Sequence, residues 1–277
     1  MTIQPVQTWA STEAVEQWRQ GAARRAQVLG PATDAMFDAA GLRPGIRVVD
    51  LAAGSGDQTI MAARRIGPSG SILAVDISPT MLAAAEQAIR EAGLANVTTM
   101  VADLSDLDLE PESFDAAISR LGLMFLPEPE LGLGRIRRGL KPDARLAALV
   151  WSSEQRNPYM GLMVGIVRDM GRLPDPPPTL VRAMSLSAPG RLERCFGAAG
   201  FRDVSVRAVA IARDFASVDE TIELLRAGAP QIELLSALSD TQRNQAWAEV
   251  ARRLQTFVKP GGHVRMPGEL LLAVGTK

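Results

Sequence analysis

The chain has 277 residues, of which 47% are hydrophobic, which is enough for one α/β domain with insertions. Its 30 basic and 31 acidic residues leave a net charge of -1, which excludes a global field that would attract nucleic acid or an anionic membrane. Cys195 is the only cysteine and His263 the only histidine, which excludes a disulfide framework and a multi-cysteine or His-rich metal site.

The N-terminal segment lacks the apolar region of a signal peptide, and no apolar run reaches the ~18 residues of a membrane span. We therefore expect a soluble, cytoplasmic protein without a metal site. Its partner is expected to be a small molecule, with no nucleic acid and no membrane insertion. The oligomeric state is left open.

The first 40 residues have a helical pattern. Ser11 can cap a helix that carries Val15 and Trp18 on one face, and a second helical stretch ends at Gly41. We expect these N-terminal helices, residues 1–40, to form part of a lid.

Short apolar runs of strand length follow, and amphipathic helical stretches separate them. The predicted strands are 46–53, 71–78, 97–104, 114–121 and 145–152, and helices are predicted to begin at Asp57, Pro79 and Pro129. Strands that alternate with helices indicate right-handed βαβ crossovers and a parallel sheet covered on both faces. We therefore predict an α/β fold with a Rossmann-like, doubly wound, mostly parallel seven-stranded sheet.

The alternation breaks after Trp151, and two insertions are predicted there. They span 153–190 and 214–266, so that the core comprises 41–152 and the remainder of 191–277, with 269–276 as its last strand. Two capping boxes are predicted to begin helices of the second insertion: Ser217 with Glu220, and Ser239 with Gln242.

The stretch VVDLAAGSGDQT, residues 48–59, places two glycines one residue apart after the first strand. In an open parallel sheet, ligands bind beyond the carboxyl ends of the strands, which makes this a candidate binding loop. A dinucleotide fingerprint would need a third glycine where Thr59 stands, and a P-loop would need a suitably spaced lysine that the chain lacks. Asp50 would also repel a pyrophosphate, although it could accept an ammonium group.

Two acids end the next two predicted strands. Asp76 lies 20 residues beyond Gly56, where a carboxylate can accept hydrogen bonds from both ribose hydroxyls. Asp103 can accept a bond from an adenine amine while Leu104 packs on the ring, although an acid at a strand end can also be a helix N-cap. Together with the glycine loop, these acids favour a nucleoside that lacks phosphates.

These motifs resemble the class I S-adenosylmethionine-dependent methyltransferases, above all the branch that includes the ubiquinone/menaquinone C-methyltransferases. The resemblance covers residues 40–152 and rests on VVDLAAGSGDQT, GPSGSILAVDISPTMLAAA, VADLSDLDLEPESFDAAISRLGLMF and IRRGLKPDARLAALVW. It implies S-adenosylmethionine as cofactor and S-adenosylhomocysteine as product. The implied cofactor-binding residues are Asp50, Ala52, Gly54 and Gly56 at the methionine part, Asp76 at the ribose, Asp103 and Leu104 at the adenine, Ile77 and Met81 against the adenosine, and Ser119 at the methionyl end.

Three positions depart from the family's pattern. Ala52 stands where many members carry glycine, and KPDARL replaces the usual KPGGRL. Arg120 stands where quinone methyltransferases usually carry an aromatic residue, which argues against a quinone substrate. Arg120 could bind a carboxylate or phosphate of the acceptor, or it could form a structural ion pair.

The usual sheet of this family ends with an antiparallel strand, so both insertions are expected at the carboxyl edge. With the N-terminal helices they would form an apolar, Met-rich helical lid, which indicates a hydrophobic or aromatic acceptor. His263 and Tyr159 are the candidate general bases, although a lone histidine in a Gly-rich turn can also be merely solvated.

The sequence thus predicts a methyltransferase that acts on carbon, oxygen or nitrogen of a small molecule. Within this class the alternative is a quinone-type C-methyltransferase. Two alternatives come from other classes: an NAD-dependent oxidoreductase, and a protein that binds S-adenosylmethionine without transferring its methyl group.

Overall fold

The computed structural model describes residues 21–171, 178–226, 234–236 and 238–277. The helix predicted around Ser11 lies outside these residues. The chain divides into two compact units. The first comprises Met1–Val150, Pro189–Val209 and Leu271–Lys277, and the second comprises Trp151–Ala188 and Ala210–Leu270.

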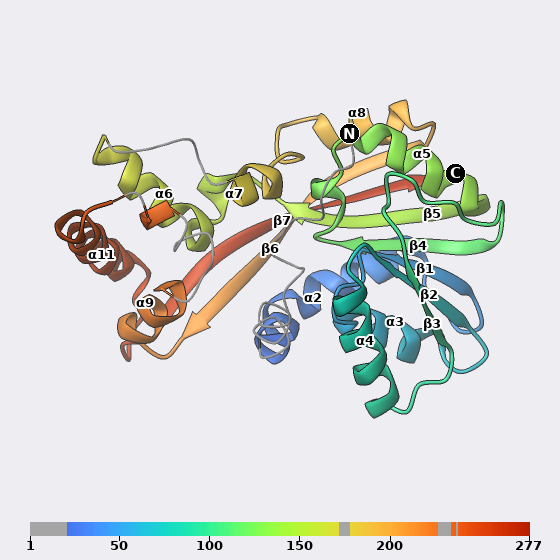
Figure 1. The fold of residues 1–277 in the computed structure, drawn as a ribbon, viewed down its shortest axis with the longest axis horizontal. Coiled ribbons are helices and arrows are strands. Elements are labelled where there is room, and N and C mark those ends of the chain that lie inside the picture. The colour runs from blue at the N-terminus through green and yellow to red at the C-terminus, as the bar shows by residue number, and fades with distance from the viewer. Residues whose placement is uncertain (1–20, 172–177, 227–233, 237) are drawn as a thin grey trace. The chain divides into compact units, whose positions relative to one another are not determined.

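The seven strands form one sheet with the order β3-β2-β1-β4-β5-β7-β6 (Figure 1). Its strands are β1 (Arg47–Leu51), β2 (Ser71–Asp76), β3 (Val97–Val101), β4 (Phe114–Arg120), β5 (Leu140–Trp151), β6 (Arg202–Phe215) and β7 (Val264–Thr276). Strands β1 to β5 pair in parallel. Strand β7 runs antiparallel to β5, because Lys277 N donates to Ala144 O and Ser152 N donates to Glu269 O. The predicted mostly parallel, Rossmann-like sheet is confirmed.

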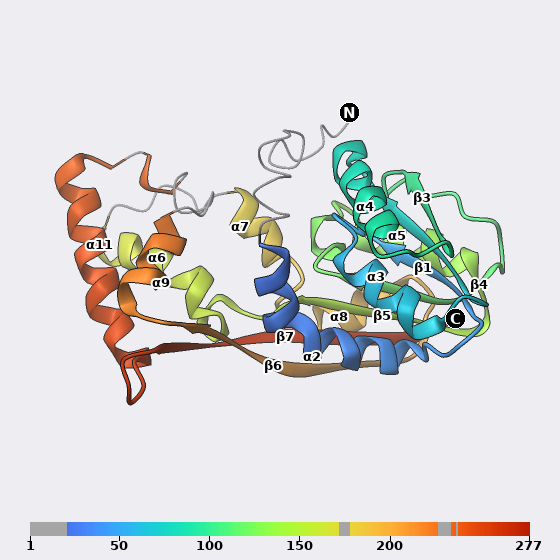
Figure 2. The ribbon, with the colours of Figure 1, turned by 90° about the horizontal axis from the view of Figure 1, so that it is seen from below.

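Helices cover both faces of the sheet in the first unit (Figures 1 and 2). Helices α2 (Ala22–Ala40), α3 (Asp57–Ile66) and α4 (Pro79–Glu91) lie on one face, and α5 (Pro129–Gly139) and α8 (Arg191–Ala198) pack together on the other. Local signals start and orient these helices. Ser78 caps α4 through a bond from Met81 N at 3.2 Å, and Pro79 occupies its first turn.

The second unit has its own apolar core. Its helices are α6 (Pro158–Asp169), α7 (Pro178–Ala183), α9 (Val218–Arg226) and α11 (Asp240–Leu254), and α11 packs on α6 and α9. The core includes Met163, Val250 and Met266. The capping box of Ser239 with Gln242 is present at the start of α11. At the other predicted box, Ser217 Oγ accepts a bond from Glu220 N, and the Glu220 carboxylate accepts one from Ala216 N.

Three strand boundaries differ from the sequence prediction by three or more residues. Strand β3 ends at Val101 instead of 104, β5 begins at Leu140 instead of 145, and β7 begins at Val264 instead of 269. The added residues of β7 alternate between buried and exposed positions, and those of β5 include the exposed Pro142 and Asp143, whereas the prediction relied on continuous apolar runs. Strand β3 is an edge strand, so the run to 104 continues past its pairing with β2.

None of the helices in the described part of the chain has the length and hydrophobicity that crossing a bilayer requires. The predicted insertions 153–190 and 214–266 fall almost wholly within the second unit. That this unit acts as a lid, together with residues 1–40, stays a prediction.

Candidate functional site

The candidate site lies at the carboxyl ends of three adjacent strands in the first unit, β2, β1 and β4. Leu51 of β1 pairs with Val75 of β2 and with Ser119 of β4, so the three strands end at the same level. The loops that follow carry the polar side chains on which the sequence prediction depends.

The loop between β1 and α3 turns through left-handed backbone conformations. Gly54 and Gly56 have φ angles of 58° and 86°, and Ala52 has a φ angle of 57°. A Cβ atom on Gly56 would also lie 3.0 Å from the Cβ of Ala85 in α4, so two separate constraints favour glycine at this position. Glycine adopts the Ala52 conformation without steric cost, which accounts for the glycine that related sequences carry there.

Asp76, the last residue of β2, connects this loop to β2 through a hydrogen bond. Its Oδ2 accepts a hydrogen bond from Gly54 N at 2.8 Å, and its Oδ1 accepts one from Ser78 N at 2.9 Å. Burial raises the pKa of Asp76, and these backbone N–H groups oppose the shift. The carboxylate therefore has a fixed orientation beside the glycine loop.

Asp50, near the end of β1, is completely buried. Thr59 Oγ1 donates to its Oδ2 at 2.5 Å, and Gln58 Nε2 donates to its Oδ1. Burial raises the pKa of Asp50 to about 7, although the bonds from Thr59 and Gln58 lower it. The described residues place no cation in hydrogen-bond contact with this carboxylate.

Gln58 and Thr59 were not predicted as site residues. Their side chains reach Asp50 from the first turn of α3, and Gln58 Oε1 is buried without a hydrogen-bond partner among the described residues. Thr59, which departs from the dinucleotide fingerprint, thus binds the acid at the end of β1. No local sequence signal identifies this pairing, because it depends on how α3 packs against β1.

The residues predicted at the adenosine side follow β2 and β3. Ile77 is 39% exposed, whereas Met81 and Leu104 are buried. Asp103 lies two residues beyond β3 and does not end the strand as predicted. Its Oδ1 accepts a bond from Ser105 N at 2.8 Å, which is a turn contact and not a helix N-cap. The contact of Asp103 with the adenine stays a prediction.

Ser119 lies at the same level as the end of β1, but its hydroxyl is already used. Its Oγ donates to Leu51 O at 3.0 Å, and the residue is completely buried. This bond ties β4 to β1. A contact between Ser119 and the cofactor stays a prediction.

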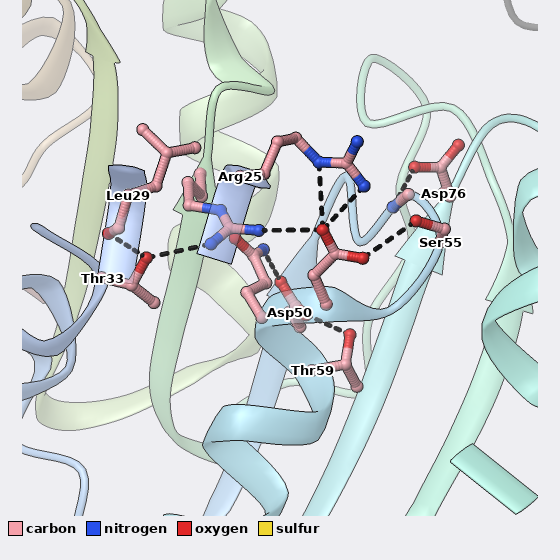
Figure 3. Close-up of polar contacts among 11 residues, drawn as sticks. Arg25, Leu29, Thr33, Asp50, Ser55, Thr59 and Asp76 are labelled. Carbon is pink, nitrogen blue, oxygen red and sulfur yellow. Dashed lines mark hydrogen bonds and ion pairs between the residues drawn. The ribbon is translucent and has the colours of Figure 1, made fainter. Parts of the chain in front are cut away.

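Two arginines converge on one carboxylate beside the glycine loop (Figure 3). Arg25 of α2 donates to Asp57 Oδ2 through Nε at 3.0 Å and through Nη2 at 2.8 Å. Arg120, at the end of β4, lies 3.8 Å from the same oxygen and donates to Thr33 Oγ1 at 3.0 Å. Burial lowers the pKa of Arg120, whereas Asp57 and Asp50 raise it. Arg120 therefore takes part in an ion pair, one of the two roles considered for it.

Tyr159 and His263 belong to the second unit. The Tyr159 ring stacks on Phe215 with centroids 5.6 Å apart. The Arg213 guanidinium lies 4.8 Å from the Tyr159 ring centroid and 5.3 Å from that of Trp151. His263 is exposed in a turn closed by Lys259 N donating to His263 O at 2.8 Å. Their roles as general bases stay predictions.

Among the described residues, no cluster of histidine, cysteine and acidic side chains could hold a metal ion. The polar groups at the edge of the sheet are buried carboxylates, an amide oxygen and guanidinium groups. This set suits a ligand that carries hydroxyl and charged amino-acid groups.

Comparison with known proteins identifies the domain. Residues 48–143 match the family model of a methyltransferase domain. A ubiquinone/menaquinone biosynthesis C-methyltransferase of Pasteurella multocida is 34% identical over 123 residues, which cover 44% of this chain and 46% of that protein. An uncharacterized protein of Mycobacterium tuberculosis is 28% identical over 164 residues, which cover 58% and 57% of the two chains. The chain thus matches about half the length of these relatives.

Solved structures share the fold. A methyltransferase from Aquifex aeolicus has a TM-score of 0.55 and 20% identity, covering 73% of this chain and 93% of that one. A phosphoethanolamine N-methyltransferase of Haemonchus contortus, solved with S-adenosyl-L-methionine, has a TM-score of 0.57 and 20% identity, covering 93% and 57%. The resemblance predicted from sequence is confirmed over residues 48–143, which match the methyltransferase-domain model, and the solved methyltransferases share the fold of this chain.

Proposed function

We propose that the protein is a methyltransferase that uses S-adenosylmethionine and acts on a small, largely apolar or aromatic molecule. The observation that carries this proposal is the orientation of Asp76, whose carboxylate is held beside the glycine loop by bonds from Gly54 N and Ser78 N. A carboxylate so placed can accept a bond from a ribose hydroxyl while its backbone bonds stay in place, because its oxygens offer about four acceptor sites.

The buried polar groups at the carboxyl edge of the sheet suit the charged methionine part of the cofactor. Among the described residues, no cation contacts the Asp50 carboxylate and no donor reaches Gln58 Oε1, so these two acceptors suit an ammonium group. Asp76 would hold the ribose, Asp103 and Leu104 the adenine, and Ile77 and Met81 the adenosine. The backbone at Ala52, Gly54, Gly56 and Ser119 would line the methionine part.

The cofactor, when bound, supplies an electrophilic methyl group, so the chain's own task is alignment and exclusion of water. A carbon or nitrogen acceptor needs little help from a base, whereas a hydroxyl acceptor would need one, for which His263 and Tyr159 are the candidates. Both kinds of acceptor are part of this proposal.

The second unit supports an apolar acceptor. Met163 belongs to its core, and Met160, Met170 and Met184 are partly buried against that core. Relatives that are named quinone C-methyltransferases make a quinone-type acceptor the runner-up. The charged Arg120, where such enzymes usually carry an aromatic residue, disfavours it. The net charge of -1 supports a small-molecule acceptor over nucleic acid and fits a cytoplasmic enzyme.

Isothermal titration with S-adenosylmethionine, S-adenosylhomocysteine and NAD tests the cofactor. We expect the two adenosyl ligands to bind and NAD not to bind. Replacing Asp76 with alanine should weaken binding at least about tenfold, because charge-assisted hydrogen bonds contribute on the order of 1.5–3 kcal/mol each. Asp108→Ala is the matched control, since Asp108 is an exposed acid of the same unit.

Asp76 also accepts a hydrogen bond from Gly54 N, so its replacement can weaken binding by disturbing the loop as well as by removing the ribose contact. A second ligand distinguishes these two effects. If Asp76 acts through the ribose, its replacement should cost much less affinity for a 2′,3′-dideoxy analogue of adenosylhomocysteine than for the parent compound. An equal loss for both ligands would contradict the ribose assignment. A screen with methyl-labelled cofactor tests the reaction, and binding without any labelled product would favour a non-methylating protein.

A further inference from the structure

Arg120 has hydrogen-bond donors that no described residue uses. Its one hydrogen bond is from Nη1 to Thr33 Oγ1, and that hydroxyl in turn donates to Leu29 O at 2.8 Å. Its Nε and Nη2 make no hydrogen bond to a described residue. The guanidinium therefore offers free donors at the carboxyl edge, although its side chain is only 8% exposed.

Asp57 does not use these donors. Arg25 takes Asp57 Oδ2 with two short bonds, and Ser55 Oγ donates to Asp57 Oδ1 at 3.1 Å. The separation of 3.8 Å between Arg120 Nη2 and Oδ2 is too long for a hydrogen bond. Two largely buried guanidinium groups thus share one carboxylate, and Arg120 is the one that makes no hydrogen bond to it.

The remaining acid near Arg120 is Asp50, whose charge interacts with that of Arg120. The two residues lie close to the carboxyl ends of neighbouring strands, because Asp50 pairs with Ile118 and Leu51 pairs with Ser119, next to Arg120. If Asp50 holds an ammonium group, as proposed above, Arg120 loses its compensating charge. An α-amino acid carries its carboxylate on the same carbon as its ammonium group, so an acid and a base on adjacent strand ends match such a zwitterion.

We propose that Arg120 binds the α-carboxylate of the methionine part of the cofactor. This inference rests on the proposed function and assigns a further residue to the same site. Arg25 contributes because it donates two hydrogen bonds to Asp57 Oδ2, so that the Arg120 guanidinium does not bind this oxygen directly. Thr33 positions Arg120 from α2, so the N-terminal helix takes part in the site without touching the ligand.

Decarboxylated adenosylhomocysteine tests the proposal, because it keeps the nucleoside and the ammonium group but lacks the carboxylate. We expect wild type to bind adenosylhomocysteine about 10–100-fold more tightly than the decarboxylated compound, as a charge-assisted Arg–carboxylate contact implies. In Arg120→Gln this preference should disappear: affinity for adenosylhomocysteine falls, and affinity for the decarboxylated compound stays at the wild-type value. Arg120→Lys should keep part of the preference.

The matched control is Arg135→Gln, which removes a partly exposed arginine paired with Asp106 and should leave both affinities unchanged. Equal weakening of both ligands in Arg120→Gln would overturn the proposal in favour of a structural role. A preference that survives in Arg120→Gln would also overturn it, and would leave an acceptor's carboxylate as the partner of Arg120. Failure of wild type to bind either compound would overturn the proposed function itself.

Discussion

At the scale of single residues, Asp50 is the side chain with the most unusual environment. It is completely buried, and it is bound by a hydroxyl and an amide instead of a cation. Such a carboxylate is stable in the fold mainly in its protonated form, until a cation reaches it. Asp50 thus links the stability of the free protein to pH and, if the proposal is right, to the binding of an ammonium group.

We predict that Asp50 makes the free protein less stable as pH rises. Its pKa is about 7 in the folded state against 3.8 ordinarily, so the folded state holds more protons than the unfolded state between these values.

Urea unfolding at about pH 4.5 and about pH 7.5 measures the effect. Asp50→Asn should show a smaller drop than wild type by up to a few kcal/mol, and Asp108→Asn should behave like wild type. The same drop in Asp50→Asn and wild type would contradict this prediction.

At the scale of elements, two loops at the edge of the sheet pack through small residues. Gly122 begins the 3-10 helix η2 (Leu123–Phe125) after β4, and it lies against the β1–α3 loop. A Cβ atom at position 122 would lie 2.4 Å from Ala52 Cβ and 3.0 Å from Ser119 Oγ. The absence of a side chain at Gly122 therefore permits the close approach that positions Ala52 and Ser119.

Gly122→Ala is expected to destabilise the protein by about 1–3 kcal/mol through overpacking of these loops, and to weaken cofactor binding. Gly134→Ala is the matched control, because Gly134 lies inside α5 with no atom within 4 Å of an added Cβ. It should stabilise the protein by about 0.5–1 kcal/mol through helix propensity. Chemical unfolding measures both, and a neutral Gly122→Ala would show that the loops can separate at little cost.

At the scale of the whole molecule, the division into two units assigns different parts of the chain to different tasks. The glycine loop, Asp76 and the Arg25–Asp57–Arg120 cluster all belong to the first unit, whereas the Met-rich core, Tyr159 and His263 belong to the second. The proposed cofactor contacts thus come from one unit. The residues considered for the acceptor, apart from Arg120, come from the other.

We predict that adenosylhomocysteine protects mainly the first unit from hydrogen exchange. At a concentration about 100 times its Kd, binding should stabilise the native state by about 2.7 kcal/mol. Hydrogen-exchange mass spectrometry should show slower exchange at residues 50–59, 76–81 and 102–105, and little change in α11, which serves as the internal control. Uniform protection of both units, or protection confined to the second, would contradict this assignment.

The sequence by itself determined the features that neighbouring residues encode. The alternation of apolar runs with helical patterns predicted the doubly wound sheet, and the glycine spacing with acids after two strands predicted the candidate site. These signals are local, because strand and helix periods and left-handed turns depend on residues a few positions apart. The starts of β5 and β7 were predicted wrongly because the first residues of these strands are not continuously apolar.

Only the tertiary structure decided which side chains meet at the edge. Arg25 and Asp57 are 32 residues apart, and Arg120 and Thr33 are 87 apart, so no local pattern pairs them. The contact of Gln58 and Thr59 with Asp50 likewise depends on the packing of α3 against β1. Such contacts form because folding buries charged and polar groups that must then find partners nearby, whatever their distance along the chain.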